Sequence, residues 1–87
     1  MRHELKTWPV YFEPTLDGRK TFEYRLDDRG FQEGDELLLK EWDPDPQDMM
    51  KKGKYTGREL LVRVGYIYLF PIELEPPVEI IMAITKV

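Results

Sequence analysis

The sequence predicts a mainly β fold with one helix, in which about five mostly antiparallel strands and an N-terminal helix form a small pseudo-barrel. Residues 21–26 alternate between apolar and polar side chains, which is typical of a strand. Residues 59–70 and 79–87 are apolar and rich in β-branched and aromatic residues. Because such strands would aggregate through open edges, we expect the sheet to close partly on itself. With 87 residues, we expect one domain spanning residues 1–87.

Residues 3–6 are expected to open the fold as a short strand. Large apolar side chains then recur at a spacing of four, which places them on one helical face: Trp8, Phe12 and Leu16. This spacing predicts that Trp8 belongs to the core. Pro9 suits a first helical turn, and Gly18 suits the position just past a helix end. Because Pro14 removes a backbone donor, we expect either a kinked helix or two short turns.

The second strand is predicted over residues 21–26. Its alternation places three side chains on one face: Phe22, Tyr24 and Leu26. The opposite face carries the polar set: Thr21, Glu23 and Arg25. Apolar faces usually point inward, so we expect Tyr24 to lie in the core.

Three more strands complete the predicted sheet. Residues 36–42 contain three leucines, which predicts a strand buried on both faces. Residues 43–57 are rich in Pro, Asp, Gly and Lys and are expected to form a long hairpin connection. Residues 59–70 follow as a long strand in which Gly65 marks a bulge or bend. Residues 79–87 are expected to close the sheet.

The composition excludes several kinds of chemistry. The chain has no Cys and no Ser, so thiol and serine nucleophiles, thiolate metal sites and disulfides are excluded. One histidine, His3, cannot make a polyhistidine zinc centre. Residues 53–58 contain glycines but lack the order of a phosphate-binding loop. We therefore expect no metal, no cofactor and no ordinary catalytic triad.

Net charge and hydropathy limit the kinds of partner and the cellular location that we expect for this protein. The net charge is −4, which argues against a broad phosphate-binding face but allows a small basic cleft. No apolar run approaches the roughly 18 residues of a membrane span. The first eight residues lack the apolar stretch of a signal peptide. We expect a cytoplasmic protein that does not contact a membrane.

Charged residues crowd into residues 18–25, which read GRKTFEYR: Arg19, Lys20, Glu23 and Arg25. Glu23 and Arg25 share a strand face about 7 Å apart, so they can pair with each other or with a neighbouring strand. A turn at Gly18 leaves the direction of Lys20 open. The plain interpretation is a solvated ion-pair face, which contributes about 0–1 kcal/mol.

Four of these residues fit the pattern G-x-K-x-x-E-x-R: Gly18, Lys20, Glu23 and Arg25. This pattern resembles the signature of ASCH domains, a branch of the PUA-like superfamily. Residues 3–43, 55–67 and 79–84 are also similar to a family of small ASCH-like proteins of bacteria and their phages. The resemblance covers nearly the whole chain.

The resemblance implies a PUA-like barrel with a helix beside it and a cleft between the two, suspected of binding RNA or one modified nucleobase. Lys20 and Arg25 would then meet a phosphate or a base edge, and Glu23 would accept from an exocyclic amine or orient Lys20. Arg29 would add a phosphate contact. Among the tryptophans, Trp42 at a strand end is the better candidate for stacking on a base.

Two other functions remain open. Some ASCH proteins resemble amidohydrolases that remove an acetyl group from cytidine N4 with the signature Lys, a Thr of the same strand and a distant Glu. Here Lys20 is present, Glu23 occupies the matching Thr position, and Thr21 lies beside Lys20. Residues 71–79 are too short for the helical insertion that carries the distant Glu. The third interpretation is a protein-interaction module that uses this loop and the methionines at 49–50.

Overall fold

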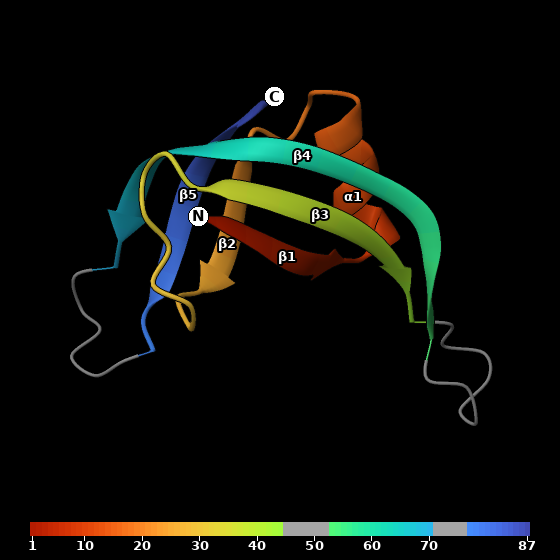
Figure 1. Ribbon diagram of the computed structural model, residues 1–87, viewed down its shortest axis with the longest axis horizontal. Coiled ribbons are helices and arrows are strands. Elements are labelled where there is room, and N and C mark those ends of the chain that lie inside the picture. Colours follow the sequence, from red (N-terminus) through yellow and green to blue (C-terminus); the bar gives the residue numbers. More distant parts are fainter. Residues whose placement is uncertain (45–52, 71–76) are drawn as a thin grey trace.

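The computed structural model describes residues 1–44, 53–70 and 77–87, and it shows one sheet curled into a half-barrel beside a short helix (Figure 1). The elements follow in chain order: β1 (Arg2–Thr7), α1 (Pro9–Leu16), β2 (Phe22–Leu26), β3 (Glu36–Asp43), β4 (Lys54–Leu69) and β5 (Glu79–Lys86). The predicted class, mainly β with five strands and an N-terminal helix, is confirmed. The predicted loops at 45–52 and 71–76, with the methionine pair, lie outside the described residues.

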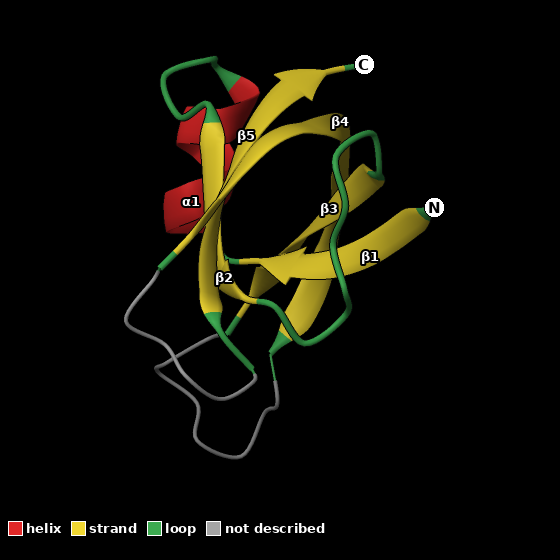
Figure 2. Cartoon of the chain, turned by 90° about the vertical axis from the view of Figure 1, so that its left-hand side faces the viewer, coloured by secondary structure: helices red, strands yellow, loops and turns green. Residues whose placement is uncertain are grey.

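The strands form a single sheet in the order β1-β3-β4-β5-β2. β1 pairs with β3 in parallel, and the other three pairings are antiparallel, as the sequence predicts. β1 and β2 are therefore the two edges of the sheet. Figure 2 shows how the curl of the sheet brings these edges toward each other on the side where α1 lies.

The core fills the concave side of the sheet with ten buried apolar residues: Leu5, Phe12, Phe31, Leu37, Leu39, Val62, Val64, Ile80, Met82 and Ile84. Their spacing follows the period of two along each strand. Phe12 is wholly buried and is the helical residue in this set. On β3 the predicted burial of both faces holds in part, because Leu38 between the two buried leucines is half-buried.

β4 begins earlier than the sequence predicts. Lys54 and Tyr55 pair with Asp43 and Trp42, so part of the expected hairpin connection is strand. The predicted irregularity at Gly65 is confirmed by a shift of register between Val64 and Ile67.

The helix decides between two alternatives that the sequence leaves open and corrects one expectation. Pro9–Leu16 is one helix that contains Pro14, so two separate turns do not form. The prediction that Trp8 lies in the core is wrong, because its side chain is half exposed. Trp8 is the N-cap residue with extended backbone (φ −66°, ψ 151°), so it stands outside the helical repeat that buries Phe12.

β2 corrects a second expectation. Its alternation is as predicted, but the faces are reversed, because Glu23 is buried while Phe22, Tyr24 and Leu26 are exposed. The prediction that Tyr24 lies in the core is therefore wrong. Its hydroxyl donates to Glu79 Oε2 at 2.7 Å on the outer face, where its ring meets Phe70 edge-on.

A second buried carboxylate joins the helix to the sheet. Glu41 of β3 accepts from Arg58 at both oxygens, at 2.9 and 2.8 Å, and from the Thr56 hydroxyl at 2.6 Å. Arg58 also binds Glu13 of α1, and its guanidinium lies over the Phe12 ring. The hydrogen bonds from Arg58 lower the pKa of Glu41, and those carboxylates in turn raise the pKa of Arg58.

Replacing Arg58 should expose the dependence of the fold on this network. Arg58→Met leaves the buried Glu41 carboxylate without its cation, so we expect the melting temperature to fall by about 10–20 °C. Arg63→Met is the matched control, because Arg63 is exposed and forms a 3.5 Å pair with Glu36. That control should change the melting temperature by less than about 3 °C. Equal shifts in the two variants would contradict the assigned role.

The Glu41 network should also make stability depend on pH. The folded pKa of Glu41 lies below its ordinary value of 4.5, so the unfolded chain binds protons first as the pH falls. Its contribution is fully present above about pH 4.5 and is lost as the pH falls through the folded pKa. Urea unfolding from pH 7 to pH 2.5 should show a shallower acid limb for Glu41→Gln than for the parent chain. Glu33→Gln, at an exposed loop position, should leave the limb unchanged.

Candidate functional site

The loop between α1 and β2 places Lys20. Gly18 adopts φ +92°, a conformation that L side chains rarely adopt, and turns the chain just past the helix as predicted. Arg19 folds back onto the exposed Asp17, with Nε 2.9 Å from Oδ2. The backbone N–H of Lys20 donates to the Pro14 carbonyl at 2.9 Å. Lys20 is thus fixed beside the helix, one residue before the extended segment that leads into β2.

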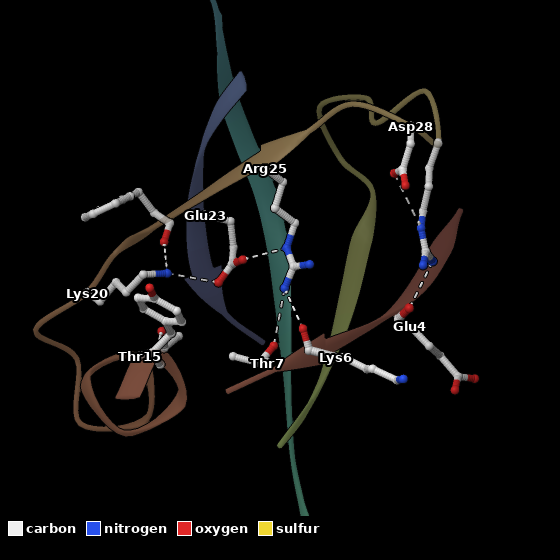
Figure 3. A network of polar contacts seen from close by, with 11 residues as sticks. Glu4, Lys6, Thr7, Thr15, Lys20, Glu23, Arg25 and Asp28 are labelled. Carbon is white, nitrogen blue, oxygen red and sulfur yellow. Dashed lines mark hydrogen bonds and ion pairs between the residues drawn. The ribbon is translucent and has the colours of Figure 1, made fainter. Parts of the chain in front are cut away.

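Glu23 is the centre of the polar cluster that Figure 3 shows. Its side chain is 4 % exposed, with Oε1 3.0 Å from Lys20 Nζ and Oε2 2.8 Å from Arg25 Nε. Lys20 Nζ also donates to the Phe22 carbonyl at 2.6 Å. A buried carboxylate costs several kcal/mol unless it is paired and hydrogen-bonded, and here each oxygen has its own cation.

Arginine side chains join the two edges of the sheet. Arg25 Nη2 donates to the Lys6 carbonyl at 2.9 Å and to the Thr7 hydroxyl at 3.4 Å. Arg29 Nη1 donates to the Glu4 carbonyl at 2.9 Å. Both acceptor carbonyls belong to β1, so side chains from β2 and the loop after it satisfy the free edge of β1 (Figure 3).

A cleft of about 640 Å³, here called the aromatic cleft, opens beside this cluster, between α1, the end of β1 and β2. Aromatic side chains, each between 44 and 54 % exposed, form much of its wall: Trp8, Tyr11, Phe22 and Tyr24. The remaining lining is polar: Lys6, Thr7, Lys20, Glu23 and Arg25. Mostly apolar walls with a few convergent polar groups, at this volume, are typical of small-molecule sites.

Comparison with known proteins places the chain in a family. Residues 2–75 match the model of a family described as a domain of unknown function, DUF3850. The chain belongs to the DUF3850 family. A 62-residue stretch is also 37 % identical to the "Uncharacterized 12.9 kDa protein in GpA 3'region" of Escherichia phage P2. That stretch covers 71 % of this chain but only 50 % of the phage protein. The kinship with ASCH domains stays a prediction.

In this DUF3850 chain, three of the sequence-predicted site residues come together. Lys20, Glu23 and Arg25 share one cluster and line one cleft. Arg29 is close by but lines a neighbouring, smaller cleft that also includes Arg25. The charged residues of the G-x-K-x-x-E-x-R pattern therefore act as one structural unit.

Two predicted residues lie elsewhere. Trp42, predicted to stack on a base, is a half-buried residue of β3 whose ring lies 4.7 Å from Lys6 Nζ, and it does not line the aromatic cleft. Thr21 is exposed and also does not line the cleft, and its carbonyl accepts from the Ile84 N–H at 3.0 Å.

Sequence reasoning missed the aromatic wall. The sequence predicts that Trp8 and Tyr24 lie in the core, and it indicates no role for Tyr11. A signal was present, because Glu23 has a cation on either side in sequence, at Lys20 and Arg25, and both can neutralise it if it is buried. Burial of Glu23 forces Phe22 and Tyr24 outward by the period of two.

Two negative findings apply to the described residues, 1–44, 53–70 and 77–87. They contain no group of three or more His, Asp or Glu side chains placed to hold a metal ion. Among them there is also no helix of sufficient length and apolarity to cross a membrane.

Removing the central carboxylate should destabilise the domain. Glu23→Ala leaves two partly buried cations, Lys20 and Arg25, facing each other, and we expect the free energy of unfolding to fall by about 2–4 kcal/mol. Urea unfolding at pH 7 measures this loss. Glu33→Ala is the matched control at an exposed position and should change stability by less than about 0.5 kcal/mol. A loss that small for Glu23→Ala would mean that the pairing is a solvated surface feature.

Proposed function

We propose that this domain binds a nucleobase, in single-stranded RNA or as a modified nucleotide or nucleoside, in the aromatic cleft. The observation that carries the proposal is the aromatic wall beside a charged cluster: flat rings from Trp8, Tyr11, Phe22 and Tyr24 remain half exposed although the chain has an apolar core to fill. Base–aromatic stacking contributes about 1–3 kcal/mol per base and tolerates every base.

The polar groups of the cleft suit the edge of a base. Each Glu23 oxygen accepts one hydrogen bond from a cation, which leaves lone pairs for an exocyclic amine. Arg25 uses Nε and Nη2 for protein contacts, and its Nη1 makes no hydrogen bond to the described residues. Donor and acceptor thus stand side by side, as recognition of a Watson–Crick edge requires.

The charge distribution favours a short ligand. The lining of the cleft contains three cationic residues, Lys6, Lys20 and Arg25, and one carboxylate, Glu23, so the cleft is locally basic in a chain of net charge −4. A long duplex would need many more phosphate contacts than this cleft offers. One or a few unstacked nucleotides fit the arrangement better.

We further propose that the domain is an ASCH-type member of the PUA-like superfamily. Gly18, Lys20, Glu23 and Arg25 keep the G-x-K-x-x-E-x-R spacing, and the half-barrel with a helix at its open side agrees with that fold. The amidohydrolase alternative, with Lys20, Thr21 and Glu23, gains no support, because Thr21 does not line the cleft. The protein-interaction alternative rests on loops outside the described residues.

Titration with mixed-sequence single-stranded RNA tests the proposal. In a Trp42→Phe background Trp8 is the remaining tryptophan, so we expect its fluorescence to be quenched as a base stacks on it. Amide NMR shifts should cluster on residues 18–29 and weaken as salt is raised.

Matched alanine variants locate the binding site. Tyr11→Ala should weaken binding by about 1–3 kcal/mol, as loss of one stacking ring predicts. Tyr66→Ala removes a ring that is 69 % exposed and lies outside the cleft, and it should leave the affinity unchanged. The proposal fails if no shift exceeds those of exposed lysines, or if the two variants bind equally well.

A further inference from the structure

A second cleft lies beside the aromatic cleft and shares two of its residues. It has a volume of about 270 Å³, and Lys6 and Arg25 line both clefts. Arg29 and Lys40 line only the second one, together with Glu4. The two clefts are therefore neighbours separated by a common wall of two cations.

The second cleft is strongly basic for its size. Four cationic side chains line it, and Glu4 is the one carboxylate in the lining, 3.3 Å from Lys40 Nζ. Two carboxylates outside the lining lie at longer distances, Asp28 3.8 Å from Arg29 Nε and Glu59 3.9 Å from Lys40 Nζ. Lys40 is held further by Tyr55, whose ring centroid lies 4.9 Å from Nζ. A concentration of positive charge in a chain of net charge −4 points to an anionic ligand.

The two arginines are fixed side by side along β1. Arg29 binds the carbonyl of Glu4 and Arg25 binds that of Lys6, two residues further along the same strand edge. Alternate carbonyls of a strand point the same way about 7 Å apart, so the guanidiniums that bind them stand in a row. Arg25 Nη1 and Arg29 Nη2 make no hydrogen bond to the described residues.

We propose that the second cleft binds the phosphate group of a nucleotide whose base lies in the aromatic cleft. This inference rests on the proposed function and makes the ligand a nucleotide or an RNA phosphate rather than a free nucleoside. Guanidinium groups with free N–H donors match phosphate oxygens, and Lys40 adds a point charge from β3. The shared wall of Lys6 and Arg25 places the phosphate next to the base.

NMR titrations of the labelled domain at low salt test the subsite. The probes are the four ribonucleosides, their 5′- and 3′-monophosphates, and inorganic phosphate. We expect at least one monophosphate to bind about tenfold tighter than its own nucleoside, since charge-assisted hydrogen bonds are the strong ones. The 5′ and 3′ series show which side of the ribose carries the phosphate. Signals of Arg29 and Lys40, which line only the second cleft, should shift with the monophosphate but not with the nucleoside.

Charge-matched variants separate the subsite from net charge. Lys40→Gln and Arg29→Gln should each reduce the advantage of the monophosphate over the nucleoside to about twofold. Arg63→Gln removes one charge outside both clefts and should retain the full advantage. Arg29→Gln also removes a hydrogen bond to the Glu4 carbonyl of β1 and could disturb the fold. Lys40→Gln keeps that hydrogen bond and therefore tests the subsite independently.

The outcomes distinguish the two proposals. Equal affinity for nucleosides and monophosphates, or an equal loss in Arg63→Gln, overturns the phosphate subsite and leaves base binding intact. If inorganic phosphate shifts the signals of the second cleft but no nucleoside binds and the base has no effect, the second cleft is an anion site alone. That result overturns the proposed function and, with it, the placement of the phosphate beside a base. Absence of shifts with every probe overturns both.

Discussion

The buried carboxylate of Glu23 is the constraint on which the site depends. A carboxylate on the inner face of β2 requires cations, and Lys20 and Arg25 supply one to each oxygen. The need for Lys20 fixes the loop after the helix, and the need for Arg25 aims a guanidinium at the carbonyls of β1. One buried charge thereby sets the loop, the contact between the sheet edges and the floor of the cleft.

The same constraint explains why β2 presents its apolar side to solvent. In most half-exposed strands the apolar face is buried, and burial of a Phe or Leu side chain stabilises by about 1.5–3 kcal/mol. β2 forgoes this at Phe22 and Leu26 in order to bury a charged cluster. Local conflicts of this kind are expected at functional sites, where stability is not the only requirement on the sequence. The conflict supports the interpretation of this strand as a binding surface.

The sequence predicts what is local and leaves open what depends on distant partners. The mainly β class, the helix and the irregularity at Gly65 follow from periodicity and from glycine and proline chemistry. Alternation shows which side chains of β2 share a face. Which of the two faces points inward depends on a contact with β1, where the Lys6 carbonyl accepts from Arg25. The prediction for Trp8 is wrong because the spacing of four continues one residue beyond the helix, onto its N-cap.

The sequence pattern also does not predict the contacts between side chains of neighbouring strands. The pairing of Glu41 with Arg58 spans the β3–β4 hairpin, whose register no local pattern specifies. The failure to place Trp42 has the same cause, because the strand end that carries it pairs with Tyr55 on an early extension of β4. The charged signature was found because its members lie within eight residues, whereas the aromatic wall combines the helix start with a strand.

The order of the strands has a consequence for when the cleft comes into being. β2 is synthesised well before β5, yet β5 is its only strand partner in the described sheet. Phe22 pairs with Ala83, and Leu26 pairs with Glu79. Pairings between such distant segments form slowly, because a long loop must close first. Until β5 docks, β2 has no strand to hold it opposite α1. We therefore expect the cleft to form late in folding, and we expect a chain that lacks β5 to carry the signature residues without a formed cleft.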